Sequence, residues 1–208
     1  QTASVSLSSY STVQLRFNNS TGTNYTGDAT IDDINIASEI TNPNPISYCS
    51  SQGNSTNDEK ISRVVYGSIN NSSTGTSGYE DFTSVSTNVA RSSTQSITIT
   101  PLWTGTIYSE GYAVWIDFNQ DGDFTDAGEQ VVTIAATKNT SVSGTITIPS
   151  SASLGNTRMR VAMKYNGTPT SCEAFSYGQV EDYTLNIVAS ARDTDENNAF
   201  VIKEEIKL

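Results

Sequence analysis

The chain has 208 residues, of which 16% are charged, and 11 Lys and Arg against 22 Asp and Glu give a formal net charge of -11. This length suits one good-sized domain, or one domain with fragments of its neighbours. An excess of negative charge repels phosphate backbones and anionic lipids, so we expect neither nucleic acid nor membrane partners. No stretch approaches the ~20 apolar residues of a membrane helix.

Residues 1–40 contain three short strand-like runs separated by Asn, Gly, Ser and Thr. Three short strands are too few for an independent core, so we interpret the segment as the closing strands of a preceding jelly-roll-like domain. Its run from Gly27 to Ile36 resembles the last strand of MAM-like or lectin-like jelly rolls in secreted bacterial proteins. Residues 41–45, with Pro43 and Pro45, predict a linker. We therefore expect the chain to be part of a longer protein.

Between residues 46 and 189, short runs of alternating apolar and polar residues are bounded by polar turn residues. Alternation is typical of strands whose two faces differ, and this spacing favours an antiparallel β-sandwich or a jelly-roll-like domain. The predicted fold class is therefore all-β. The predicted strands are 60–69, 95–102, 111–118, 130–136, 141–148, 157–165 and 180–188.

Alternation also assigns side chains to the two faces of a strand. In the last predicted strand, Tyr183, Leu185 and Ile187 share the core-facing side. In an earlier strand, Val142, Ile146 and Ile148 do the same. For the strand 157–165 we expect an outward row of Arg158, Arg160 and Lys164, and a core row of Met159, Val161, Met163 and Tyr165.

Two cysteines, Cys49 and Cys172, lie near the two ends of this predicted domain. We expect a disulfide between them, and two free buried thiols are the alternative. A bridge that closes so long a loop would contribute about 4–5 kcal/mol in the chain-entropy model. It would also place the protein in an oxidising compartment.

The run from Asp117 to Glu129 carries oxygen-bearing side chains at loop positions 1, 3 and 5 and Gly122 at position 6, as at the start of an EF-hand loop. Alternate residues of such a tight loop can turn toward one Ca²⁺ ion. Glu129 stands at position 13 rather than 12, and a strand rather than a helix precedes the loop, so we expect a structural ion between strands. The alternative is an acidic hairpin turn without an ion. The predicted ligands are Asp117, Asn119, Asp121, Asp123 and Glu129.

Five motifs together resemble the GEVED domain over residues 46–188. They are Tyr48-Cys49, the run from Val114 to Phe124, Ile148-Pro149-Ser150, the run from Arg158 to Val161, and the run from Tyr177 to Tyr183. The motif that names the family, Gly-Glu-Val-Glu-Asp-Tyr, occurs at residues 178–183 with Gln179 in place of its first Glu. The resemblance implies a calcium-binding β-sandwich accessory module of large secreted bacterial proteases, glycoside hydrolases or adhesins.

Such proteins often end in a type IX secretion sorting domain, and residues 190–208 are similar to the linker that precedes it. The resemblance thus implies a secreted or cell-surface location and a monomer within a multidomain chain. The sorting domain itself is not part of these 208 residues.

The sequence gives little support to catalysis. It has no histidine, which excludes a Ser-His-Asp triad and His-ligated zinc within this chain. A carboxylate-pair hydrolase would need Glu110, Glu129 or Glu173 to converge with an Asp, and their spacing does not indicate this. Adjacent residues of a strand point to opposite faces, so Glu181 and Asp182 cannot face one substrate. We expect Asp182 to pair with Arg158 or Arg160, and a second cation site is the rival interpretation.

Exposed aromatic rings could bind a ligand, and Trp103, Tyr108 and Tyr112 are the candidate contacts, although such rings also close the ends of a sandwich as core. The predicted function is a non-catalytic, calcium-stabilised accessory module that assists binding to an extracellular polysaccharide, protein or cell surface. A structural spacer between domains is one alternative. A fragment of a hydrolase with its own activity is the other.

Overall fold

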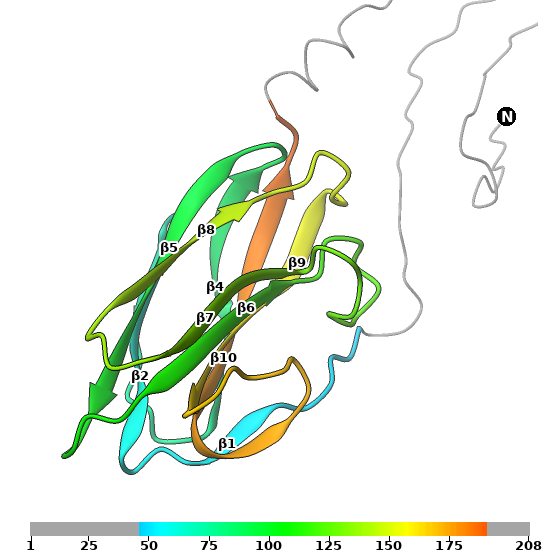
Figure 1. Cartoon of the computed structure of the whole chain (residues 1–208). Coiled ribbons are helices and arrows are strands. Elements are labelled where there is room, and N and C mark those ends of the chain that lie inside the picture. Colours follow the sequence, from blue (N-terminus) through cyan, green and yellow to red (C-terminus); the bar gives the residue numbers. More distant parts are fainter. Residues whose placement is uncertain (1–45, 191–208) are drawn as a thin grey trace, which may run out of the picture. The chain divides into compact units, whose positions relative to one another are not determined.

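The computed structural model describes residues 46–190, so the predictions for residues 1–45 and 191–208 lie outside the described part of the chain (Figure 1). Within residues 46–190 all regular structure is β, and no helix there is long and apolar enough to cross a membrane. The strands are β1 (Gln52–Ser55), β2 (Glu59–Tyr66), β3 (Ile69–Ser72), β4 (Tyr79–Ala90), β5 (Thr94–Trp103), β6 (Glu110–Ile116), β7 (Gln130–Thr137), β8 (Val142–Thr147), β9 (Gly155–Tyr165) and β10 (Ala174–Val188).

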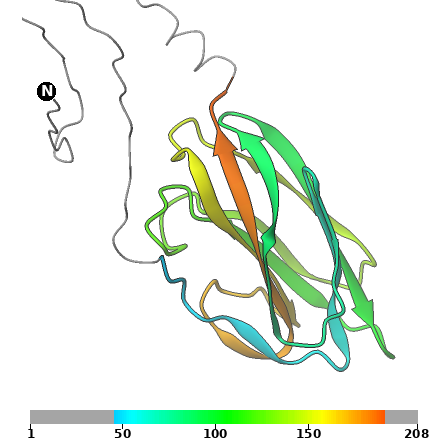
Figure 2. The same cartoon turned by 180° about the vertical axis from the view of Figure 1, so that it is seen from behind.

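Two sheets pack face to face, which confirms the predicted all-β sandwich (Figures 1 and 2). The smaller sheet has the strand order β3-β2-β5-β8. The larger has the order β1-β10-β9-β6-β7, and β4 also pairs with β10. The loop that joins β6 to β7, where a cation site is predicted, therefore connects two neighbouring strands of the larger sheet.

The long strand β10 organises the larger sheet. One of its edges pairs antiparallel with β9, while the other pairs with β1 near its start and with β4 along the rest. Both β1 and β4 run parallel to β10. Alternation of side chains is the same in parallel and antiparallel strands, so the sequence pattern could not reveal these two parallel pairings.

The core fills the space between the sheets as alternation predicts. Ile61, Ile97 and Ile99 from the smaller sheet belong to the same buried cluster as Val114 and Val161 from the larger one. Each aliphatic side chain buried in this way stabilises the fold by about 1.5–3 kcal/mol. Most of the predicted core positions are confirmed as buried: Val142, Ile146, Ile148, Met159, Val161, Met163, Tyr183, Leu185 and Ile187.

One predicted core residue is wrong. Tyr165, the last residue of β9, is 41% exposed, because it lies where the strand ends and packs edge-on against Tyr108 and Tyr177 instead of core residues. Alternation assigns the face of a side chain, but not whether the opposite sheet extends far enough to cover it.

The outer face of the larger sheet is also covered in part. A second apolar cluster contains Trp115, Phe124 and Phe175, with Tyr48 packed against it. Strand β6 is consequently buried along its whole length. Arg160 points to this outer face as expected, yet its side chain is only 3% exposed. A polar residue predicted to face outward is thus buried beneath a second layer.

The predicted strand 60–69 is interrupted in the structure. Gly67 adopts a φ of +57° in a two-residue turn, and the chain reverses there from β2 into β3. Positive φ is the conformation that glycine adopts without steric penalty. Strands β1 and β4 were not predicted, because the first is only four residues long and the second is a partly exposed strand rich in Ser and Thr.

Candidate functional site

The predicted calcium loop begins at Asp117, which is fully buried directly after β6. Its Oδ1 accepts a hydrogen bond from the backbone N–H of Gln120 at 2.6 Å. Its Oδ2 accepts from the N–H of Gly122 at 3.0 Å and from the hydroxyl of Tyr48 at 2.8 Å. A carboxylate has about four lone-pair positions, so three hydrogen bonds leave one for a cation. Asp117 therefore shapes the turn and retains the capacity to act as a ligand.

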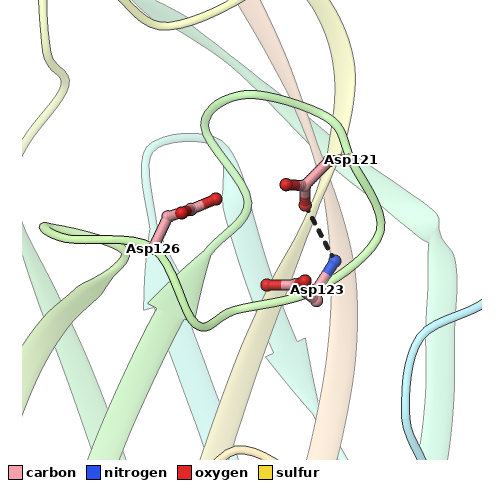
Figure 3. A group of neighbouring side chains, drawn as sticks. All are labelled: Asp121, Asp123 and Asp126. Atoms are coloured by element: carbon pink, nitrogen blue, oxygen red, sulfur yellow. Dashed lines mark hydrogen bonds between the residues drawn. The ribbon is translucent and has the colours of Figure 1, made fainter.

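Three carboxylates converge further along the loop (Figure 3). One oxygen from each of Asp121, Asp123 and Asp126 lies within 4.8 Å of the others. The backbone N–H of Asp123 donates to Oδ1 of Asp121 at 3.2 Å, which holds the side chain of Asp121 against the loop backbone. The pKa of Asp123 is lowered by hydrogen bonds from the N–H and the hydroxyl of Thr125. These are hard oxygen ligands of the kind that Ca²⁺ binds.

The side chain of Asn119 lies between two of these acids. Its Nδ2 donates to Asp121 Oδ2 at 2.8 Å and to Asp126 Oδ2 at 2.7 Å. The amide therefore places partial positive charge between two carboxylates. The two ends of an amide have nearly the same shape, and a rotation of the amide by 180° would direct Oδ1 toward the same point. In the present orientation Oδ1 accepts from the N–H of Asp121 at 3.2 Å, so a cation bound to Oδ1 after such a rotation would replace this hydrogen bond.

Glu129 lies at the end of the loop, directly before β7. It is 2% exposed, its Oε1 accepts from the N–H of Phe118 at 2.9 Å, and its Oε2 accepts from the N–H of Asp126 at 3.4 Å. Burial raises the pKa of Glu129 to about 6, with Asp117 and Asp126 adding to the increase. A carboxylate that is hard to ionise in its surroundings gains most from a nearby cation.

The structure thus divides the predicted ligand set. Asp121 and Asp123 converge, together with Asn119, whereas Asp117 and Glu129 hold the backbone of the same loop. Asp126 belongs to the converging group and was not predicted. It stands at loop position 10, outside the EF-hand spacing that directed the prediction, but it is a carboxylate within the same loop. The presence of a further carboxylate in the loop, rather than the EF-hand spacing, was the signal that could have identified Asp126.

Asp182 forms a buried ion pair on the outer face of the larger sheet. Both of its oxygens accept hydrogen bonds from Arg160 at 2.8 Å, and its Oδ2 also accepts from Arg158 at 2.9 Å and from the hydroxyl of Tyr79 at 3.1 Å. Glu181 faces the core and accepts from the hydroxyl of Tyr183 at 2.6 Å. The predicted structural pair is therefore present, and Asp182 is neutralised by two guanidinium groups.

Cys49 and Cys172 form the expected disulfide, with a Cα–Cα distance of 5.5 Å across a sequence separation of 123. The alternative of two free thiols is wrong. The bridge lies beside the ion pair, because Nη1 of Arg160 donates to the carbonyl oxygens of Cys49 and Ser171. The first described residues are thereby held against the start of β10.

The three aromatic residues predicted to contact a ligand differ in their burial in the structure. Tyr112 is fully buried in the core, so it cannot contact a ligand at the surface, and that prediction is wrong. Tyr108 is 38% exposed, and Trp103 is partly exposed with its Nε1 3.4 Å from Oε1 of Glu110.

The glutamates considered for hydrolysis have separate surroundings. Glu110 lies beside Trp103, Glu129 lies in the loop, and Glu173 pairs with Lys164.

A comparison with protein families matches residues 111–186 to the GEVED domain. The matched segment is similar to a GEVED domain. It contains the β6–β7 loop, the ion pair and the motif at residues 178–183, which confirms the resemblance. No curated protein matches the chain. GEVED domains are extracellular accessory modules, and the disulfide fits that location.

The folded unit is larger than the GEVED match. Strands β1 to β5 precede residue 111, yet β1 and β4 pair with β10, and β2 and β5 supply one half of the core. The GEVED segment alone would leave the inner face of its sheet uncovered except by β8.

Proposed function

We propose that this chain acts as a non-catalytic, calcium-stabilised accessory module of a secreted bacterial hydrolase or adhesin. The observation that supports calcium is the convergence of Asp121, Asp123 and Asp126 around the amide of Asn119. Calcium takes about six to eight oxygen ligands at roughly 2.3–2.6 Å, and this loop supplies enough carboxylate, amide and carbonyl oxygens for such a shell. An ion there would stabilise the β6–β7 connection rather than perform chemistry.

Calcium titration of the full 208-residue chain tests this proposal. A ligand that binds only the folded state stabilises it by about 2.7 kcal/mol at a hundred times its Kd, so Tm should rise with added Ca²⁺ and fall on chelation. The double variant D121N/D123N should lose this response. D81N, which removes an exposed carboxylate from β4 outside the loop, is the matched control and should keep it. An unchanged Tm after chelation would refute the role of calcium.

We further propose that the module assists binding to an extracellular polysaccharide or protein, and works as a monomer within a larger protein. Exposed aromatic rings at one end of the sandwich support a binding role. The negative charge of -11 argues against nucleic acid and anionic membranes as partners. Retention of the chain on insoluble polysaccharides or on immobilised extracellular proteins is the supporting result.

A structural spacer is the second candidate function, and the disulfide that ties Cys49 to Cys172 favours it. A spacer would show no retention across a broad panel of polymers.

Catalysis is a third possibility, which we do not propose because the chain has no histidine and Glu110, Glu129 and Glu173 have separate partners. Hydrolytic activity of the isolated chain that is lost on mutating one carboxylate would overturn this assignment. The proposal includes export by a type IX secretion route, and the residues that suggest this route lie outside the described range.

A further inference from the structure

A small pocket of about 190 Å³ is lined by three tyrosines and two acids: Asp58, Glu59, Tyr108, Tyr165 and Tyr177. Glu59 begins β2 in the smaller sheet, whereas Tyr165 ends β9 in the larger sheet. Tyr108 precedes β6, and Tyr177 lies in the first part of β10. The pocket thus joins both sheets. It shares no residue with the β6–β7 loop or with the Asp182 ion pair.

The three rings are exposed and stand at right angles. Tyr165 meets Tyr108 with centroids 5.6 Å apart and an interplanar angle of 87°, and it meets Tyr177 at 6.1 Å and 86°. Each tyrosine is about two-fifths exposed. Rings that meet edge to face enclose a compact group from several sides, whereas a sugar ring stacks on one open, flat face. This arrangement therefore suits a small, rounded ligand group.

The charge around the pocket is negative and has no counter-ion. The ion pairs formed within residues 46–190 involve only Asp182 and Glu173 as acids, so Asp58, Glu59 and Glu110 have no cationic partner there. Glu59 is 2% exposed and is the cross-strand partner of Trp103. Trp103 in turn lies against Glu110, whose cross-strand partner on β9 is Tyr165.

Glu110 provides an independent sign that positive charge is lacking. It is fully buried, and its Oε2 has no hydrogen-bond partner. Burial and the nearby Glu59 raise the pKa of Glu110 to about 7, and burial with Asp58 also raises the pKa of Glu59. A buried carboxylate without a partner takes up a proton more readily, and a positive group nearby would favour its ionised form instead, so the binding of a ligand cation would be coupled to ionisation of Glu110.

We propose that this pocket binds an organic cation, namely an alkylammonium or guanidinium group. Tyrosine faces attract such cations through the ring quadrupole, and the carboxylates add direct charge attraction. An anionic ligand would be repelled by the same acids. The cation can belong to a small molecule or to a Lys or Arg side chain of an extracellular protein, and both sources share the chemistry that the pocket recognises. The inference rests on the proposed binding role, but it is independent of calcium.

The test compares choline with 3,3-dimethyl-1-butanol, which has the same shape without the charge. Binding to the full chain is measured by NMR shifts or calorimetry in saturating Ca²⁺. We expect choline, or the amides of N-acetyl-lysine and N-acetyl-arginine, to bind and the neutral alcohol not to bind. Preference for choline indicates a small-molecule source, and preference for the amino-acid amides indicates a protein side chain. Equal binding of the alcohol, or no binding of any cation at millimolar concentration, would overturn the proposal.

Variants locate the site. Y177A should weaken cation binding by roughly tenfold, whereas Y177F, which keeps the ring, should bind nearly as well as the wild type. L154A removes an equally exposed apolar side chain at a distance in sequence and is the matched control. Tm verifies that each variant folds. If Y177A binds cations as the wild type does, the pocket is refuted, and retention on a polymer by the same variant would leave the accessory function intact.

Discussion

Arg160 holds both oxygens of Asp182, with Nε 2.8 Å from Oδ1 and Nη2 2.8 Å from Oδ2. The remaining guanidinium nitrogen of Arg160 donates to the backbone carbonyls of Cys49 and Ser171. One side chain therefore ties β9 to β10 and to both segments that carry the disulfide. Bidentate, charge-assisted hydrogen bonds of this kind are roughly twice as strong as neutral ones.

Removal of the acid should strongly destabilise the fold. In D182A the buried Arg160 loses its counter-ion, and an unpaired buried charge costs about 3–5 kcal/mol. Urea unfolding with and without the substitution measures this loss. D58N, which removes an exposed carboxylate outside this ion pair, should change the free energy of unfolding little. A loss below about 1 kcal/mol for D182A would mean that the pair contributes little to stability.

Removal of the disulfide should reduce stability through the unfolded state. A bridge between residues separated by 123 positions restricts the unfolded chain by about 5 kcal/mol in the chain-entropy model. C49S/C172S should therefore unfold at a much lower urea concentration. The reduced wild-type protein should behave like this double variant, and equal stability of the oxidised and reduced proteins would contradict the prediction.

The unpredicted acid of the loop should contribute to calcium affinity. D126N removes one of the three converging charges while keeping an oxygen that can accept from Asn119. We expect Ca²⁺ affinity to fall by roughly tenfold or more, which corresponds to about 1.4 kcal/mol. Calorimetric titration of the chelator-treated protein measures the change. Unaltered affinity would place the ion elsewhere in the loop.

Glu181 should make stability depend on pH. Burial raises its pKa from 4.5 to about 7, its Oε1 has no hydrogen-bond partner, and its cross-strand neighbour is Glu80. The folded state therefore binds a proton more tightly than the unfolded state does. The stabilisation of the folded state by this proton is fully present below about pH 4.5 and is lost as the pH rises through about 7.

Replacement of Glu181 by Gln removes the charge and keeps the shape. E181Q should be more stable than the wild type by about 2 kcal/mol at pH 8, and the difference should shrink toward pH 5. Unfolding free energies at several pH values test this expectation. If the two proteins respond equally to pH, Glu181 does not titrate in the predicted range.

Much of the fold could be predicted because its inner strands alternate strictly. Met159, Val161 and Met163 recur every second residue, and the same rule assigned Asp182 to the face where the arginines lie. The parallel pairing of β1 and β4 with β10 could not be predicted, because strand direction leaves no mark on side-chain alternation.

The sequence could not predict burial on the outer face of the larger sheet or at the ends of its strands either. Arg160 is buried because residues around Tyr48 fold over the outer face, and Tyr165 is exposed because it lies where the strand ends. Both outcomes depend on distant segments. In the loop, the EF-hand spacing identified Asp121 and Asp123, but a strand-to-strand connection follows a different path and brings Asp126 to the same point.

The bridge between Cys49 and Cys172 also determines how the domain would carry mechanical load. A pull applied at residues 46 and 190 would pass through the disulfide directly into β10, since Cys172 lies just before that strand. The chain between the two cysteines, roughly 400 Å if fully extended, would bear no tension along its own backbone. Such a domain would lengthen little under force even after losing its structure, and the β6–β7 loop would lie within the part protected from stretching.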